Sequence, residues 1–122
     1  MSLSPNTLQS FSFDNPPTFP LPRSSEIQNN YDKHMANSKA CQKFKKDIKN
    51  ILSSSEYHIQ KNDFPYLIQE GVEHLLFWTR DVSNAMVIIP TMFDSKLIAF
   101  WQNHPSNCSI PEIDHIHVFL RT

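Results

Sequence analysis

The most restrictive feature of this sequence is its single glycine, Gly71, in a chain of 122 residues. Loops that cradle phosphate groups need several glycines, because only glycine lets the backbone N–H groups come close to a ligand. Neither a P-loop nor a dinucleotide-binding fingerprint can be built around Gly71 alone. The sequence therefore excludes kinase-like and Rossmann functions.

The most unusual pattern is a C-terminal segment, residues 115–120, in which two histidines alternate with apolar residues. Residues i and i+2 of a strand point to the same side, so His115 and His117 share one face and Ile116 and Val118 share the other. Residues 72–78 and 97–102 are also predicted as strands. If the three strands pair in one sheet, His74 comes within reach of the two histidines, because neighbouring strands lie about 4.8 Å apart.

Two helical regions are predicted. Between Ile27 and Leu52 apolar residues recur at three- and four-residue spacing, with a break expected at Asn37-Ser38. A second helix is predicted over residues 83–93, capped by Asp81 or Ser83, although Pro90 leaves a strand at 86–89 as an alternative. We expect an α+β fold over residues 27–122, with a small antiparallel sheet packed against two helices.

Residues 56–71 are predicted as a connection, because Pro65 and Gly71 favour turns there. Five prolines in residues 1–26 are expected to exclude helix and central strand from that segment, which we predict to be an extended or disordered arm. Its aromatic residues leave two alternatives open. The arm is either a mobile tail, or it packs on the domain or on a protein partner.

Charge is balanced over the whole chain, with 11 basic and 12 acidic residues, but it is unevenly distributed. Residues 31–50 carry a lysine cluster, which is interpreted first as a solvated helix face and second as a partner-binding surface. Residues 62–122, which contain the histidine pattern, are acidic, and this disfavours nucleic acid as a ligand.

Only Cys41 and Cys108 are present, so no disulfide framework is expected. No apolar run could span a membrane and no secretory signal is recognised, so we expect a cytoplasmic location.

From about Asp63 to the C-terminus the sequence resembles the fungal N-acetylglucosamine-induced protein family, a domain family of unassigned biochemical function. The residues that carry the resemblance are Phe64-Pro65-Tyr66, Val72-Glu73-His74, Trp78, Asn103, Pro105, Ser109 and His115-Ile116-His117-Val118-Phe119. His104 departs from the family pattern. The resemblance implies a shared core and a shared polar cluster, and it supplies no reaction.

Three interpretations of the histidines stay open. In the first, they perform acid–base or nucleophilic chemistry on a phosphate ester. The segment also resembles the histidine-triad strand of nucleotide hydrolases, which implies His117 as nucleophile and His115 as its support, with Phe119 in place of a third histidine. In the second, His115 and His117 bind a metal, completed by His74, His104, Asp114 or Glu112. In the third, they are structural and hydrogen-bond to the backbone.

We therefore predict a histidine-lined pocket that binds or turns over a small phosphorylated or sugar-derived ligand. Whether the protein is an enzyme stays open. No particular cofactor is indicated. The alternatives are a non-enzymatic interaction module, acting through the arm and the lysine-rich helix, and a metal-binding protein. Besides His74, His115 and His117, the candidate ligand-binding residues are Asn103, His104, Ser109, Trp78 and Arg121. A Cys108 thiol near His104 is a weaker nucleophile candidate.

Overall fold

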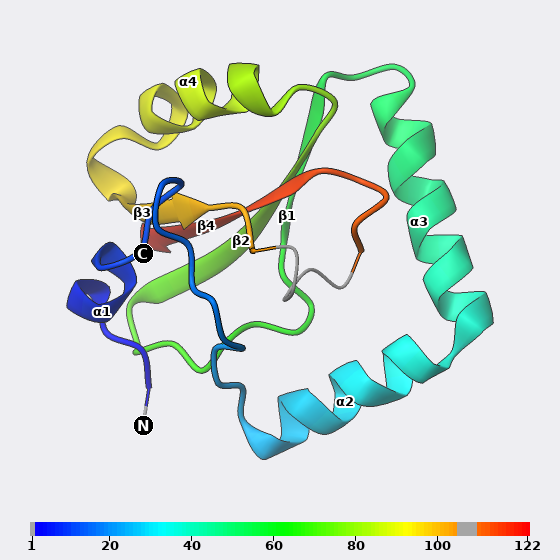
Figure 1. Ribbon diagram of the computed structural model, residues 1–122, viewed down its shortest axis with the longest axis horizontal. Helices are drawn as coiled ribbons and strands as arrows, with labels where there is room; N and C mark the ends of the chain where they lie inside the picture. The colour runs from blue at the N-terminus through cyan, green and yellow to red at the C-terminus, as the bar shows by residue number, and fades with distance from the viewer. Residues whose placement is uncertain (1, 105–109) are drawn as a thin grey trace.

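The structure, a computed structural model, describes residues 2–104 and 110–122. Four antiparallel strands form the central layer of this part of the chain (Figure 1). The strands are β1 (Tyr57–Lys61), β2 (Val72–Thr79), β3 (Leu97–Trp101) and β4 (His115–Arg121), in the order β1-β2-β4-β3. β2 and β4 pair in the middle of the sheet, with His74 opposite Phe119 and Trp78 opposite His115. The predicted α+β class is confirmed.

Strand β1 shows that the prediction of a simple connection over residues 56–71 is wrong in its first part. β1 pairs with β2, with Tyr57 opposite Thr79 and Lys61 opposite Leu75. It lies at the edge of the sheet, and its residues are partly buried or exposed. An edge strand of this kind has only a weak apolar alternation, which is why its sequence does not stand out.

Helices α2 (Ser25–Ala36) and α3 (Ser38–Leu52) follow one another with a single residue between them, and Figure 1 shows them framing two sides of the molecule. Asn37 serves both helices. Its N–H donates to the carbonyl of His34, and its side-chain oxygen accepts the N–H of Ala40 at 3.1 Å. The predicted break at this point is therefore confirmed. α3 buries Ile48 and Leu52, whereas α2 buries no side chain.

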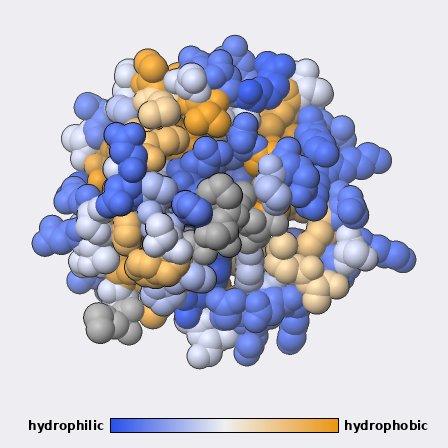
Figure 2. All heavy atoms as spheres, viewed as in Figure 1, coloured by the Kyte–Doolittle hydropathy of each residue, from blue (hydrophilic) through white to orange (hydrophobic). Residues whose placement is uncertain are grey.

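Helix α4 (Val82–Phe93), followed by a 3-10 turn (Asp94–Lys96), confirms the predicted second helix. Asp81 is its cap, because the carboxylate accepts the N–H of Asn84 at 3.1 Å. Ala85 and Ile89 pack on one face of the sheet. The outer surface of α4 is apolar, with Met86, Val87 and Met92 exposed, and Figure 2 shows hydrophobic atoms gathered over this helix.

Within the described ranges, no helix is long and apolar enough to cross a membrane.

The two faces of the sheet have different characters. The face under α4 is apolar, with Leu75, Phe77, Ile116, Val118 and Leu120 in one cluster. On the opposite face lie His74, Leu76, Trp78, His115, His117 and Phe119, by the alternation of β2 and β4. This face meets α3 through Ile48 and Leu52. The three histidines thus share one face, as the sequence pattern predicts.

The N-terminal arm contains a helix, α1 (Pro5–Gln9), so the expectation that prolines exclude helix from residues 1–26 is wrong. Pro5 is the first helical residue, where its missing N–H is not needed, and Ser4 caps the helix by accepting the N–H of Thr7. Leu8 is fully buried, and Phe11 packs on Trp101 at a centroid distance of 5.4 Å. Of the two alternatives for the arm, the structure shows the packed one.

Candidate functional site

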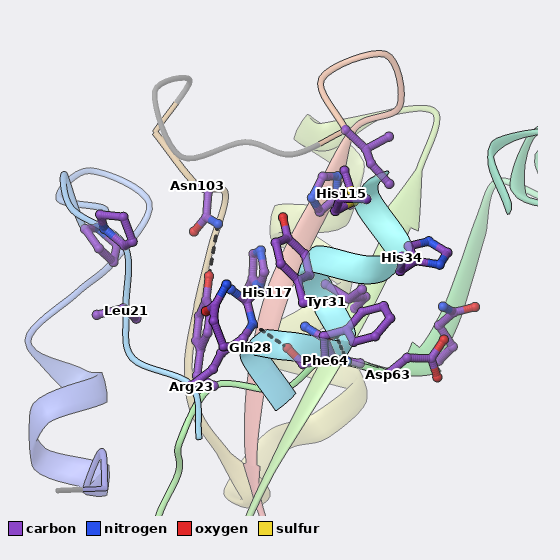
Figure 3. A pocket seen from close by; sticks show the side chains of 18 of the residues that line it. Leu21, Arg23, Gln28, Tyr31, His34, Asp63, Phe64, Asn103, His115 and His117 are labelled. Carbon is purple, nitrogen blue, oxygen red and sulfur yellow. Dashed lines mark hydrogen bonds between the residues drawn. The ribbon is translucent and has the colours of Figure 1, made fainter. Parts of the chain in front are cut away.

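A pocket of about 390 Å³ lies on the histidine-bearing face of the sheet. Side chains from several parts of the chain surround it, and Figure 3 shows Arg23 from the arm, Tyr31 from α2, Phe64 from the β1–β2 connection and His117 from β4 around one space. Much of the lining is aromatic or apolar, and a few polar groups stand among these side chains. Concave sites of this size and composition are typical of small-molecule binding.

A chain of buried hydrogen bonds fixes the protonation of two histidines. The backbone N–H of Tyr66 donates to Nδ1 of His74 at 3.2 Å, so this nitrogen carries no proton and Nε2 does. Nε2 of His74 lies 2.8 Å from Nδ1 of His117, which therefore accepts. The proton of neutral His117 consequently sits on its own Nε2. Asn62 Nδ2 also lies 3.4 Å from Nε2 of His74, but both groups are donors, so this contact is not a hydrogen bond.

Burial keeps both of these imidazoles neutral. It is the main cause that lowers the pKa of His74 from 6.5 to about 3, with a smaller contribution from the positive charge of Arg23. Burial also lowers the pKa of His117 well below 6.5, followed by the charges of His74, His115 and Arg23. Neutral rings are what the hydrogen-bond chain requires, because a protonated His117 could not accept the proton of His74.

His115 has the opposite tautomer. Its Nδ1 lies 3.0 Å from the carbonyl oxygen of Ile113, and a carbonyl can only accept, so Nδ1 carries the proton and Nε2 has a lone pair. Burial lowers the pKa of His115, against the Ile113 hydrogen bond and the charge of Asp114, which raise it. The hydrogen bond to Ile113 is the type of contact expected of a structural histidine. The same ring also lines the pocket.

Two buried donors have no acceptor among the residues that the structure describes. They are Nε2 of His117 and Nε1 of Trp78, and both residues line the pocket. His117 is 4% exposed and Trp78 is 1% exposed, so bulk water does not compensate them freely. Most buried polar groups in proteins have a partner, and those without one call for an explanation.

Arg23 supplies positive charge at the pocket. Its Nε donates to the carbonyl of Phe64 at 2.8 Å, and its guanidinium carbon lies 4.2 Å from the ring centroid of Tyr31 and 5.1 Å from that of Tyr66. These contacts hold the side chain in place. Among residues 2–104 and 110–122 the ion pairs are Lys43–Asp47 and Lys45–Glu112, and neither involves Arg23. Asp63, an exposed residue, also lines the pocket.

The residues predicted from sequence separate into three groups. His115, His117, Trp78 and Asn103 line the pocket; Asn103 accepts from Trp101 Nε1 and donates to the Tyr66 hydroxyl, both at 3.0 Å. His74 supports His117 through its hydrogen bond and is not a lining residue. His104 and Arg121 are exposed and do not line it. Ser109 and Cys108 lie outside the described residues.

Several lining residues were not indicated as site residues by the sequence, among them Arg23, Gln28, Tyr31 and Tyr66. Arg23 had one available signal, since it is the only basic residue in residues 1–26. Tyr66 stood in the Phe64-Pro65-Tyr66 segment that carried the family resemblance. Gln28 and Tyr31 look like ordinary surface residues of a helix.

The metal interpretation is not supported by the geometry. Across the described ranges, no group of three or more histidine, cysteine, aspartate or glutamate residues is placed to hold a metal ion. Three of the four ring nitrogens of His74 and His117 are also engaged in hydrogen bonds. The set of ligands proposed around His115 and His117 is therefore not assembled.

The fold and the pocket define a small α+β protein with a buried histidine pair under a partly aromatic pocket. Residues 20–85 match a family described as "Protein of unknown function (DUF3605)", and because this match covers more than half of the chain, the protein belongs to that family. The matched region begins well before Asp63 and includes the lysine-rich helix α3. The match ends at residue 85, so it includes Phe64-Pro65-Tyr66, Val72-Glu73-His74 and Trp78 but not the motif residues from Asn103 onward, and it does not confirm the N-acetylglucosamine-induced family.

Two individual proteins show similarity. The "Uncharacterized protein YPL067C" of Saccharomyces cerevisiae is 28% identical, in an alignment that covers 56% of this chain and 45% of the yeast protein. The chain therefore matches less than half of the length of this relative. A crystal structure described as "Crystal Structure of HTC1" superposes with a TM-score of 0.61 at 21% identity, covering 84% of this chain and 76% of the other. That likeness shows a common fold.

Proposed function

We propose that the protein binds a small phosphorylated or sugar-derived ligand in this pocket. The observation that carries the proposal is a pair of buried N–H donors, His117 Nε2 and Trp78 Nε1, which belong to pocket-lining residues and have no acceptor among residues 2–104 and 110–122. An unsatisfied buried donor costs roughly 1–3 kcal/mol, and an oxygen atom of a ligand would remove that cost. The preferred ligand is consequently rich in hydrogen-bond acceptors.

Arg23 favours a ligand with negative charge. Its guanidinium is oriented by the Phe64 carbonyl and by the rings of Tyr31 and Tyr66, and its remaining N–H groups suit the oxygens of a phosphate or carboxylate. The aromatic side chains of the lining offer flat surfaces for the apolar face of a sugar or for a heterocycle. A phosphorylated sugar combines both properties.

The hydrogen-bond chain favours binding over nucleophilic catalysis by His117. A nucleophile needs a lone pair directed at the substrate, whereas Nε2 of His117 carries a proton because Nδ1 accepts from His74. The neighbour that orients His117 is also His74, and not His115 as the histidine-triad resemblance implied. His117 is therefore proposed as a binding residue.

The contacts of the arm and of the lysine-rich helix do not favour the interaction module over the pocket. The arm uses its aromatic residues within the chain, since Phe11 contacts Trp101 and Phe13 contacts Phe100. In the lysine-rich helix, Lys43 and Lys45 form ion pairs with Asp47 and Glu112. The interaction hypothesis would have to rest on the remaining exposed surface.

Calorimetric titration and thermal unfolding with a ligand panel test the proposal. The panel contains inorganic phosphate, glucose 6-phosphate, ribose 5-phosphate, N-acetylglucosamine and its 6-phosphate, the last two because of the family resemblance. We expect at least one phosphorylated sugar to raise Tm and to bind at least tenfold more weakly to Arg23→Gln. Arg80→Gln is the matched control, since Arg80 is exposed and does not line the pocket. Absence of binding by the whole panel, or equal effects of the two substitutions, would contradict the proposal.

A further inference from the structure

We propose that the β4 wall of the pocket recognises neighbouring hydroxyl groups of a sugar ring, through a donor on His117 and an acceptor on His115, while Arg23 binds the phosphate of the same molecule. The inference rests on the proposed function and specifies its ligand as a sugar phosphate, in preference to a simple phosphate or an alkyl phosphate. His74 acts as the positioning residue, because it decides which nitrogen of His117 carries the proton.

The two histidines both line the pocket and carry complementary groups. His117 offers Nε2–H, since its Nδ1 is occupied by His74. His115 offers the lone pair of Nε2, since its Nδ1 donates to Ile113. They stand two residues apart on β4, with ring centroids 5.7 Å apart. One strand therefore places a donor and an acceptor side by side.

A sugar satisfies this pair better than an anion does. Each hydroxyl group both donates and accepts, so one hydroxyl accepts from His117 while its neighbour donates to His115. An ionised phosphate has only acceptor oxygens, so beside His115 its negative charge would be repelled by the lone pair of Nε2. Neither histidine brings a positive charge, because burial lowers the pKa of both. The anionic group is thus directed away from His115.

The rest of the pocket has the polarity that this orientation requires. Trp78 adds a second unpartnered N–H beside His115, with ring centroids 4.5 Å apart, and Phe44 packs on Trp78 at 5.5 Å. Arg23 is associated with Tyr31 and Tyr66. Figure 3 shows His117 between Arg23 on one side and His115 on the other. The pocket therefore has a neutral end suited to hydroxyl groups and a cationic end suited to phosphate.

The order of the hydrogen bonds gives His74 its role. Its Nδ1 is held by the backbone N–H of Tyr66, which can only donate. Without His74, Nδ1 of His117 would lose its donor, and the ring could move its proton to Nδ1 and present a lone pair to the pocket. Two adjacent lone pairs, on His115 and His117, would no longer match a pair of hydroxyl groups.

The test compares sugar phosphates with n-hexyl phosphate, which carries the same anionic group and no hydroxyl groups. We expect the tightest of glucose 6-phosphate, ribose 5-phosphate and N-acetylglucosamine 6-phosphate to bind the wild-type chain at least tenfold more tightly than hexyl phosphate. In His74→Leu this ratio should fall toward one, whereas Arg23-dependent binding of both phosphates remains. His74→Gln, whose amide can accept from Tyr66 and donate to His117, should keep most of the selectivity.

Long-range ¹H–¹⁵N spectra of the wild-type imidazoles provide a readout that does not depend on the stability of any variant. They should show His117 protonated at Nε2 and His115 protonated at Nδ1. The reverse tautomer for either ring would overturn the inference. Equal, Arg23-dependent affinity for sugar and hexyl phosphates would also overturn it, and would leave the proposed function standing. Failure of every phosphate to bind would overturn both.

Discussion

His74 donates its Nε2 proton to Nδ1 of His117 across 2.8 Å, although 43 positions separate the two residues in the chain. The pair joins the two central strands on the face that carries the pocket. Because the hydrogen-bond chain starts at a backbone N–H, that of Tyr66, the protonation of both rings is set by the fold.

Stability should fall in mild acid. The pKa of His74 is lowered from 6.5 to about 3 by burial, so protons bind the unfolded chain more tightly than the folded one. The stabilisation is fully present above about pH 6.5 and is lost as the pH falls toward about 3. Between about pH 7.5 and about pH 5 this group alone should lower the free energy of unfolding by about 2 kcal/mol. Urea unfolding at both pH values measures the change.

A pair of histidine variants isolates the source of that pH dependence. His74→Gln should reduce the difference between the two pH values, because it removes a buried titrating ring. His58→Gln, at a partly buried position on β1 whose ring bonds to Gln60, should leave most of it in place. An unchanged pH dependence in His74→Gln would contradict the assignment.

Two buried tryptophans should respond differently to the same substitution. Trp101 and Trp78 are 0% and 1% exposed, but Nε1 of Trp101 donates to Asn103 at 3.0 Å, whereas Nε1 of Trp78 has no acceptor in the described part of the chain. Trp101→Phe loses a hydrogen bond, so it should cost about 1 kcal/mol more than Trp78→Phe in equilibrium unfolding. A larger cost for Trp78→Phe would show that its N–H is satisfied in solution.

The arm should be part of the folded core. Leu8 is fully buried in a cluster with Trp101 and Phe119, so Leu8→Ala should lower the free energy of unfolding by about 2–5 kcal/mol. Phe19, in the same arm, is 54% exposed, and Phe19→Ala should have a much smaller effect in the same unfolding measurement. Similar, small losses for both variants would indicate that the arm detaches in solution.

The cap of α4 distinguishes two residues that the sequence left as alternatives. Asp81 accepts the N–H of Asn84, so Asp81→Ala should cost about 1 kcal/mol, measured by chemical denaturation. Ser83 lies inside the helix, and Ser83→Ala should change stability by less than about 0.5 kcal/mol. The opposite ranking would mean that the helix begins later than the structure shows.

Local patterns predicted the parts of the fold that are made by regular, buried elements. The alternation at His115 and His117 gave the correct face, and the apolar spacing between Ile27 and Leu52 gave the helical region with its break at Asn37. The elements that were missed are short and weakly patterned. Strand β1 is held by pairing with β2, and α1 can form because Pro5 stands at its first position, where no N–H is needed.

The candidate site was predictable only in the part that lies on the strands. Its remaining members, such as Arg23 and Tyr31, come from the arm and from α2, and they meet the histidines only after the chain has folded. Each has an ordinary surface sequence context. The role of His74 could not be predicted from the sequence either. The nitrogen of His74 that carries the proton is set by the backbone N–H of Tyr66, and a pattern of side chains gives no information on that contact.

Helix α2 forms a wall of the pocket and buries no side chain of its own. Four of its five partly buried residues, Gln28, Tyr31, His34 and Met35, line the space that a ligand would fill. With so little packing, α2 should open locally more often than α3, which buries Ile48 and Leu52, and its amides should exchange with solvent faster. Filling the pocket would add the missing contacts, so slowed hydrogen exchange confined to α2 would report ligand binding even before the ligand is identified.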